Sequence, residues 1–216
     1  MKHRKTSELF LYWNRLRGDR PAPRRTDVEP ADIKELLADT FILEEDSRGN
    51  AVFRLSGTRL CAAYGRELKG FVFSSLWPDK DQRLVDRLVR DAFHKNTITT
   101  IRFEGATQSG RTTEFELIVL PVTSDDGGAR ALGLIASLDL PFWLGADPVL
   151  ANRTQAVRVI DPDREPMYLK NRPEVPLPMS VKAPALDPSA GDDPAREVDR
   201  PRRVRHLMVL EGGLRD

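Results

Sequence analysis

The sequence has few of the residues that build covalent or metal-centred sites. Its single cysteine, Cys61, excludes a disulfide framework within the chain and any zinc or iron–sulfur site that needs several cysteines, and it is compatible with a reducing compartment. The three histidines lie too far apart in the sequence for a metal-ligand spacing. No run of ~18–20 apolar residues is present, and no cleavage site follows the basic N-terminus. We therefore expect a cytoplasmic protein without a membrane-spanning segment.

An excess of charge of one sign is also absent. Lys and Arg total 34 against 33 Asp and Glu, so any nucleic acid or membrane partner would need a local patch. A first arginine cluster is predicted to be a solvated face, partly paired with Asp19, Asp27 and Glu29. A second cluster lacks interleaved aromatic residues and has acidic neighbours, so nucleic-acid binding is disfavoured. The two clusters are Arg17, Arg20, Arg24 and Arg25, and Arg200, Arg202, Arg203 and Arg205.

Proline divides the chain into two parts. Ten of the sixteen prolines fall in residues 145–216, where they remove backbone donors and interrupt helices and central strands. We expect residues 145–216 to form a proline-rich tail, with 161–200 extended or disordered. Two apolar segments in this tail, 156–160 and 204–210, are each able to add a short strand to another element.

The first half of the chain before the tail shows one amphipathic helix and one hairpin. Leu9, Trp13 and Leu16 recur at helical spacing, which predicts a helix over residues 7–17. A second short helix is expected over 32–37. Turn-forming residues between two apolar runs then predict a β-hairpin over residues 40–55.

The second half begins with the longest helix. Paired apolar residues four positions apart predict a helix over 79–95, with Asp79 and Gln82 as a capping box and Asn96 past its end. Three strands are expected to follow, joined by glycine-containing turns: 98–107, 112–122 and 131–140.

These elements predict an α+β fold with a single five-stranded antiparallel sheet and helices on one face. Short hairpin loops keep neighbouring strands antiparallel, and the helices between the second and third strands must cover the face that is buried. We assign residues 1–37 to an N-terminal helical segment and residues 38–144 to the sheet domain.

Three stretches of sequence resemble the PAS domain family, and within it the small bacterial stand-alone PAS proteins that carry an N-terminal helix. The resemblance covers residues 5–143 and implies the strand order 2-1-5-4-3, with a cavity between the sheet and its helices. Proteins of this family sense small molecules or join proteins together. The stretches that carry the resemblance are Trp13-Asn14-Arg15-Leu16-Arg17-Gly18, the segment from Arg20 to Leu37, and Phe53-Arg54-Leu55-Ser56-Gly57-Thr58 with Tyr64-Gly65-Arg66-Glu67-Leu68-Lys69-Gly70.

Such a cavity would be apolar with a few polar anchors. Ala92, Ala136 and Gly105 are small, so they leave space that either a small apolar ligand or the neighbouring phenylalanine rings must fill. A core filled by side chains is the alternative. The candidate ligand-binding residues are Tyr64, Phe71, Phe73, Trp77, Leu88, Ala92, Phe103, Phe115, Leu134 and Ala136.

Two residues raise the question of a cofactor. Cys61 lies near the position where light-sensing PAS relatives keep a flavin-reactive cysteine, but its neighbours Arg59-Leu60 and Ala62-Ala63 do not match the run expected there. His94 ends the helix from which haem-binding relatives supply their ligand, yet a histidine in a last turn commonly pairs with free carbonyls. We expect neither cofactor, and no metal.

No catalytic motif is present, and an enzymatic role is not expected. The predicted function is a regulatory module that contacts another protein and is modulated by a small molecule; the alternatives are a flavin or haem sensor and, more weakly, a nucleic-acid-binding regulator. The N-terminal helix carries more apolar surface than one stripe needs, which predicts a homodimer through it. The predicted interface residues are Leu9, Phe10, Tyr12, Trp13 and Leu16.

Overall fold

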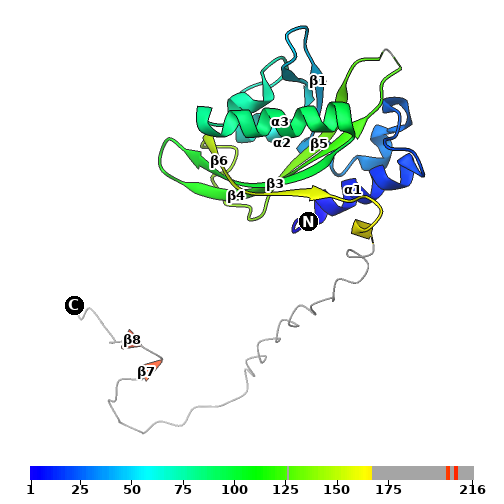
Figure 1. Cartoon of the computed structure of the whole chain (residues 1–216). Coiled ribbons are helices and arrows are strands. Elements are labelled where there is room, and N and C mark those ends of the chain that lie inside the picture. Colours follow the sequence, from blue (N-terminus) through cyan, green and yellow to red (C-terminus); the bar gives the residue numbers. More distant parts are fainter. Residues whose placement is uncertain (126, 167–202, 205–206, 209–216) are drawn as a thin grey trace, which may run out of the picture. The chain divides into compact units, whose positions relative to one another are not determined.

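The computed structural model describes residues 1–125, 127–166, 203–204 and 207–208, which fall in two units, Met1–Pro173 and Glu174–Asp216 (Figure 1). None of the described helices is long and apolar enough to cross a membrane. The helices of the first unit are α1 (Arg4–Arg17), α2 (Thr58–Ala63) and α3 (Asp79–Lys95), with short 3₁₀ helices η1 (Arg25–Asp27), η2 (Pro30–Ile33), η3 (Leu37–Asp39) and η4 (Phe73–Leu76). Its strands are β1 (Thr40–Glu45), β2 (Ala51–Ser56), β3 (Ile98–Thr107), β4 (Thr112–Val122), β5 (Arg130–Ser137) and β6 (Val149–Ile160).

Helix α3 confirms the helix that the apolar spacing predicts. It begins at Asp79, with Pro78 rather than Asp79 as the N-cap, and it ends at Asn96 in the left-handed conformation with φ 54°. Acidic residues in its first turn and basic residues in its last complement the helix dipole. Its apolar stripe is buried against the sheet, which fixes the helix on one face.

The strands form one antiparallel sheet in the order β2-β1-β5-β4-β3-β6. The order of the first five strands is the one that the resemblance implies. The prediction of only five strands is wrong, because β6 pairs with β3 along nearly its whole length. The sheet therefore continues past the predicted boundary at residue 144, and the segment 156–160 is the end of a strand that starts at Val149.

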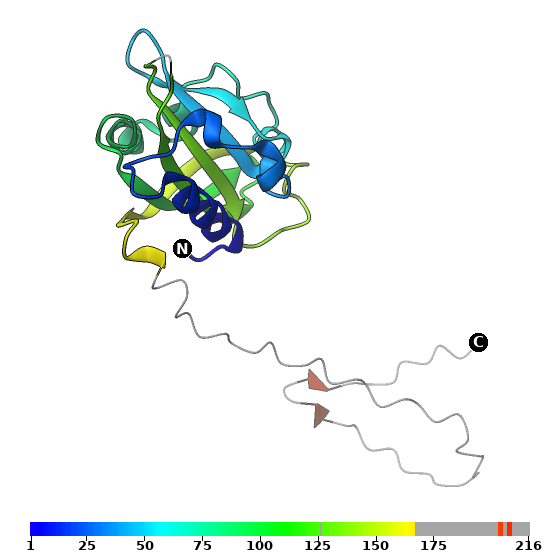
Figure 2. The ribbon, with the colours of Figure 1, turned by 90° about the vertical axis from the view of Figure 1, so that its right-hand side faces the viewer.

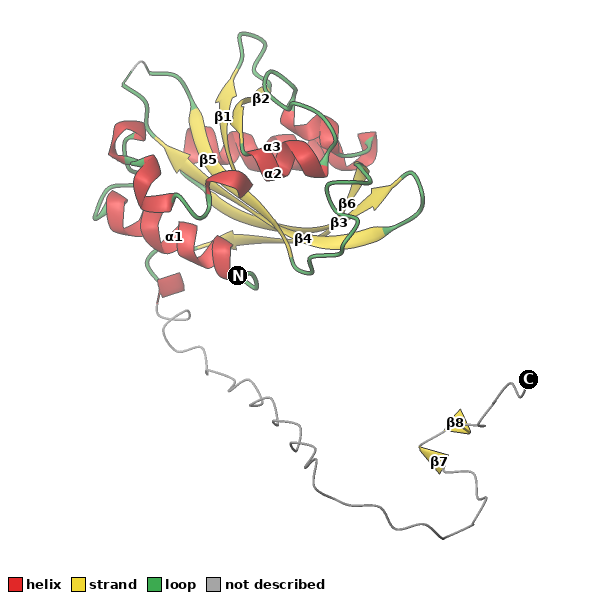
Figure 3. Ribbon diagram, turned by 180° about the vertical axis from the view of Figure 1, so that it is seen from behind, coloured by secondary structure: helices red, strands yellow, loops and turns green. Residues whose placement is uncertain are grey.

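Both faces of the sheet are covered, which corrects the prediction of helices on one face (Figure 3). We call the face under α3 the inner face and the face under α1 the outer face. The run Leu117–Val122 of β4 is apolar at every position and buried throughout, so it supplies side chains to both faces. A second apolar face must be removed from water, and α1 does this (Figure 2).

The predicted dimer surface on α1 is instead part of the core of its own chain. Leu9, Phe10 and Trp13 are fully buried, and Leu16 packs at the margin of the same cluster. The indole Nε1 of Trp13 donates a hydrogen bond of 2.7 Å to the carbonyl oxygen of Pro121. The surplus apolar surface of this helix, with Tyr12 also buried, covers the outer face of the sheet and is not available to a second copy.

The N-terminus of α1 is fixed to β4 by a buried carboxylate. Glu116 accepts hydrogen bonds from the backbone N–H of Lys2 at 2.7 Å and of His3 at 3.1 Å, and from the hydroxyl of Thr6. The side chain of His3 caps the helix by accepting from the N–H of Lys5. A negative charge at this end of the helix is favourable because its N–H groups lack internal partners.

In the second unit, β7 (Arg203–Val204) and β8 (Leu207–Met208) pair with each other in antiparallel fashion, so the segment 204–210, expected to add one short strand to another element, takes part in a short hairpin instead. The expectation of extended or disordered chain over 161–200 concerns mainly residues outside the described part, as does most of the second arginine cluster.

Candidate functional site

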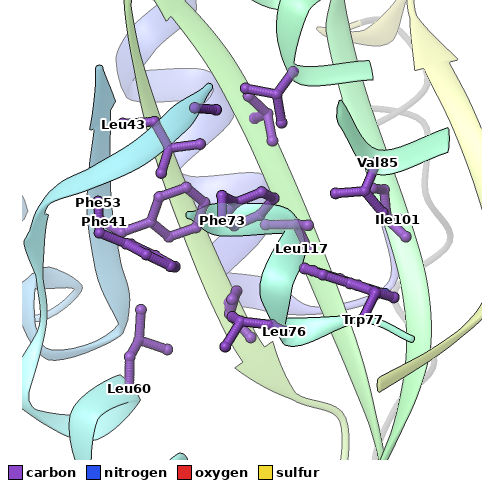
Figure 4. Packing of buried hydrophobic residues seen from close by; sticks show 14 of the residues in the cluster. Phe41, Leu43, Phe53, Leu60, Phe73, Leu76, Trp77, Val85, Ile101 and Leu117 are labelled. Atoms are coloured by element: carbon purple, nitrogen blue, oxygen red, sulfur yellow. The ribbon is translucent and has the colours of Figure 1, made fainter. Parts of the chain in front are cut away.

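Aromatic side chains fill the region between the inner face and α3, where the ligand cavity was expected (Figure 4). The rings of Phe41, Phe53 and Phe73 contact one another with centroids 5.3–5.7 Å apart. The chain of rings continues through Trp77 to Phe103 and Phe115, whose rings stack at 5.1 Å. Phe115 also occupies the space beside Gly105. Neighbouring rings thus fill the space left by this small residue.

The structure brings together seven of the ten predicted ligand-binding residues and separates three. Leu134 and Ala136 belong to the outer cluster, on the face of the sheet opposite Leu88 and Ala92, because alternate residues of β5 point to opposite faces. Phe71 is 43% exposed, with the guanidinium of Arg66 over its ring. The seven that lie in one cluster are Tyr64, Phe73, Trp77, Leu88, Ala92, Phe103 and Phe115.

One polar pair is buried at the margin of this cluster. The side-chain amide of Asn152, on β6, donates a hydrogen bond of 2.9 Å to the hydroxyl of Tyr64. Burial raises the pKa of Tyr64 well above its ordinary value, so the phenol stays neutral. The Oδ1 atom of Asn152 and the Nε1 atom of Trp77 are buried without a partner. The sequence does not predict a buried role for Asn152, because it lies in the segment 145–216 that the prolines mark as a tail.

Neither candidate cofactor residue faces the inner cluster. The thiol of Cys61 lies 3.1 Å from the hydroxyl of Ser56 and 3.6 Å from a carboxylate oxygen of Glu67. Ser56 is partly exposed and Glu67 is exposed, so the thiol is directed toward the protein surface. The imidazole of His94 is half-exposed and lies 3.2 Å from Glu45. The aromatic rings between α3 and the sheet contact one another, and neither Cys61 nor His94 belongs to their cluster.

An open apolar groove lies instead on the outer face, and a β-bulge creates its floor. Leu43 pairs with Phe53 and Ile42 with Leu55, so Arg54 is the extra residue of β2. This one-residue shift reverses the facing of the strand, because side chains alternate between faces. Leu55 therefore lies beside Ile42 on the outer face, and it is 48% exposed.

The wall of the groove comes from the segment between α1 and β1. The helical turns η2 and η3 cross the outer face and bury Leu36 but leave its neighbour Leu37 38% exposed. The groove has a volume of about 310 Å³ and is lined almost entirely by carbon. Its lining residues are Arg25, Val28, Pro30, Ile33, Leu37, Thr40, Ile42, Leu55 and Leu132.

A basic border adjoins the groove. A second hollow of about 330 Å³ shares Arg25, Ile42 and Leu55 with it and adds Arg54 and Lys69. Glu44 is the acidic residue of this lining, and it is paired with Arg54 at 2.7 Å. An apolar floor with an excess of positive charge at one end suits an occupant that has apolar side chains and nearby carboxylates.

The first arginine cluster contributes only in part to this border. Arg20 pairs with Asp27 at 2.8 Å, as the sequence predicts, and this contact holds the pKa of the Asp27 carboxyl below its usual range. Arg17 is nearly buried and pairs with Asp163 at 2.5 Å. Arg25 is thus the member of the cluster that lines the groove.

Part of the chain is similar in sequence to a known family and in structure to several solved proteins. Residues 1–136 match the sequence profile of the family described as PAS domain, whereas no curated protein matches the chain. The blue-light photoreceptor Aureochrome1 LOV in its dark state is 17% identical, covers 50% of this chain and 80% of its own, and gives a TM-score of 0.39. A LOV protein from Rhodobacter sphaeroides is 13% identical over 53% of this chain and 71% of its own, with a TM-score of 0.39. The PAS domain of a protein from Colwellia psychrerythraea is 17% identical, covers 51% of this chain and 98% of its own, and gives a TM-score of 0.36.

Proposed function

The chain belongs to the PAS domain family of sensory and regulatory modules, and we propose that it regulates by binding a segment of another protein in the apolar groove. The segment has apolar side chains that enter the groove and acidic residues that pair with the basic border. In this proposal the protein is cytoplasmic and non-enzymatic. The single cysteine, which is compatible with a reducing compartment, supports the first point.

The observation that carries the proposal is the contrast between the two faces. Inside, the rings from Phe41 to Phe115 occupy the region proposed for a small apolar ligand. Outside, Leu37 and Leu55 expose apolar surface next to an excess of basic over acidic residues in the lining of the adjoining hollow. Exposed apolar surface costs free energy in water, and a contiguous patch of it commonly marks a contact with a partner.

A cofactor-carrying sensor is the second candidate, in line with the LOV proteins among the similar structures. The poor fit around Cys61 and His94 disfavours it. An absorbance spectrum of the purified full-length protein separates the candidates, because flavin and haem both absorb visible light and a protein-binding module without them does not.

Site-specific crosslinking tests the groove directly. The full chain with p-benzoylphenylalanine at position 55 is irradiated in the native cell, and crosslinked peptides are identified by mass spectrometry. The proposal expects one reproducible partner peptide with apolar and acidic residues, reduced at least tenfold by Arg25→Glu or Leu37→Asp. Incorporation at position 11, an exposed leucine on α1, serves as the matched control.

Two results would overturn the proposal. One is a crosslinking yield at position 55 no higher than at position 11. The other is a crosslink that persists in Arg25→Glu, or whose peptide carries no acidic residue, because the charge argument then fails. Crosslinking to an extractable small molecule instead of a peptide would favour a ligand-binding role for the groove.

A further inference from the structure

A small cavity lies where the first turns of α1 and α2 meet η3 and the end of β5. None of its described lining residues belongs to the groove. Leu140, which lines it, is 79% exposed, so the cavity is open to solvent on that side. Its volume of about 70 Å³ is far below the roughly 300 Å³ at which sites for drug-sized ligands begin, so an occupant has only a few non-hydrogen atoms.

Part of the lining is a cluster of charged side chains around Asp39. The carboxylate of Asp39 is buried, and its Oδ2 atom accepts hydrogen bonds from the ammonium of Lys5 and from the guanidinium of Arg59. One oxygen atom therefore joins the first turns of α1 and α2. Gly57 allows this approach, because a Cβ atom there would collide with two carbonyl oxygens at Leu37 and Ala38. The backbone thus holds η3 directly against the start of α2.

This cluster holds more positive than negative charge. In the described part of the chain, neither Lys5 nor Arg59 has a carboxylate partner other than Asp39, so two cations share one carboxylate. Each makes one hydrogen bond to it, although an ammonium has three N–H donors and a guanidinium has five. Their side chains are 31% and 49% exposed, so the remaining donors are accessible. One further negative charge would make the cluster neutral.

His3 adds an uncharged donor to the same lining. Its Nδ1 atom accepts a hydrogen bond of 3.0 Å from the N–H of Lys5. Burial, and then the charge of Lys5, lower the pKa of His3, so the ring is neutral at pH 7 and carries its proton on Nε2. Glu116, a carboxylate that also acts on His3, accepts from the N–H groups of Lys2 and His3 and does not line the cavity. Its charge is thus engaged elsewhere.

The rest of the lining is mainly apolar. Leu60 and Ala63 come from α2, Phe115 from β4 and Ile135 from β5, and Leu144 lies at the margin of the inner cluster. An inorganic anion would lose its hydration against these side chains without new hydrogen bonds in return. A hydrocarbon group gains from the same contact. The cavity therefore suits a molecule with one anionic end and one apolar end.

We propose that this cavity binds a short-chain aliphatic monocarboxylate, of the size of acetate, propionate or butyrate. Its carboxylate accepts hydrogen bonds from Lys5 and Arg59 and supplies the missing negative charge. Its hydrocarbon chain packs against Ala63 and Phe115. The proposal goes beyond the proposed function and does not depend on it, because the cavity and the groove have different linings.

A titration with matched small molecules tests the chemistry of the site. The full-length chain, labelled at its methyl groups, is titrated at neutral pH with sodium propionate and followed by nuclear magnetic resonance, with ionic strength held constant by sodium chloride. We expect saturable binding, at least tenfold tighter than that of propionamide, which has the same shape without the charge. Phenylacetate, which is too large for the cavity, should also bind at least tenfold more weakly. Nuclear Overhauser effects should join the methyl group of propionate to that of Ala63.

Substitutions test the charged and the apolar parts separately. Arg59→Gln removes one cation and should weaken propionate binding at least fivefold. Ala63→Val takes up space in the cavity and should weaken it by a similar factor. Arg153→Gln is the matched control, because Arg153 is an exposed arginine with one ion pair, to Glu104 at 3.2 Å, and does not line the cavity. Its affinity for propionate should be unchanged.

Circular dichroism establishes that each variant is folded, and the comparison of ligands on the unchanged chain decides the matter if one is not. The proposal is overturned if no saturable binding of acetate, propionate or butyrate is found at tens of millimolar. It is also overturned if propionamide binds as tightly as propionate, if the Overhauser effects do not include Ala63, or if Arg59→Gln binds as tightly as Arg153→Gln. Competition by chloride as strong as propionate binding itself would show a simple anion site and would equally overturn it.

Discussion

Gly105 of β3 lies against the ring of Phe115 on the neighbouring strand: a Cβ atom on the glycine would come within 2.7 Å of Cε2 of the ring and 2.9 Å of a methyl group of Val149. The absence of a side chain at one position is therefore what allows the ring at the other to lie flat in the core. We predict that Gly105→Ala lowers the free energy of unfolding by about 1–3 kcal/mol through overpacking. Urea denaturation measures the change.

The same pair offers its own control. Phe115→Leu removes the ring atoms that the new methyl group would meet, so the double variant should lose less stability than the sum of the two single variants. Additive losses would show that the strain at Gly105 arises elsewhere.

The anchor of α1 on β4 gives a second prediction. Glu116→Ala leaves the N–H groups of Lys2 and His3 without their acceptor, and we expect a loss of about 1–3 kcal/mol in the free energy of unfolding. Glu116→Gln keeps an acceptor oxygen and should lose less. Glu114→Ala, two residues earlier on the same face of β4, is the control in the same urea titration. Equal losses at both positions would contradict the anchoring role.

His3 makes the stability of the fold depend on pH. Burial, and then the charge of Lys5, lower the pKa of His3 below its ordinary 6.5, while Glu116, Asp39 and Glu8 act in the opposite direction. Between the lowered pKa and 6.5 the unfolded chain binds more protons than the folded one, so stability rises with pH in this window and is lost as the pH falls through it.

Substitution isolates this contribution. His3→Asn retains a helix-capping acceptor but does not titrate. Melting temperatures measured from pH 7.5 to pH 5 should fall less for His3→Asn than for the unchanged chain, since the other two histidines are common to both. If the melting temperatures of the two proteins fall in parallel with pH, His3 is not the cause of the pH dependence.

The burial of Trp13 predicts a loss of folding rather than of assembly. Trp13→Ala should cost about 3–5 kcal/mol, because it empties a fully buried site and removes the hydrogen bond to Pro121. Leu11→Ala, at a half-exposed position of the same helix, should be nearly neutral. If thermal melting shows Trp13→Ala to be as stable as Leu11→Ala, α1 is not part of the core.

The sequence predicts well those elements whose pattern is local. Helix α3 and the strands β3 and β4 have the predicted bounds, because their apolar periodicity and glycine-containing turns need no distant partner. Strand β6 was recognised only at its end. Asn152, Arg153 and Thr154 interrupt its apolar pattern, and what holds this stretch in the sheet is its pairing with β3, about fifty residues earlier in the chain.

The groove was not predictable from alternation alone. Ala51 and Phe53 are buried on the inner face, and strict alternation would place Leu55 with them. The bulge at Arg54 reverses this, and a bulge depends on the partner strand β1 rather than on β2 itself. The second buried face did leave a signal, since the uninterrupted apolar run Leu117–Val122 is typical of a strand covered on both sides.

The order of the strands also governs when each part of the chain is able to fold. The meander of β3, β4 and β5 joins neighbours in sequence, whereas β1 has to wait for Ala131–Leu134 of β5, and Trp13 for a carbonyl 108 residues further along. At a synthesis rate of about 5–20 residues per second, these early segments spend on the order of 5–20 s outside the ribosome without their partners. During this time Phe41, Leu43 and the apolar face of α1 are exposed to chaperones and prone to aggregation. Their burial has to wait until β4 and β5 have been synthesised.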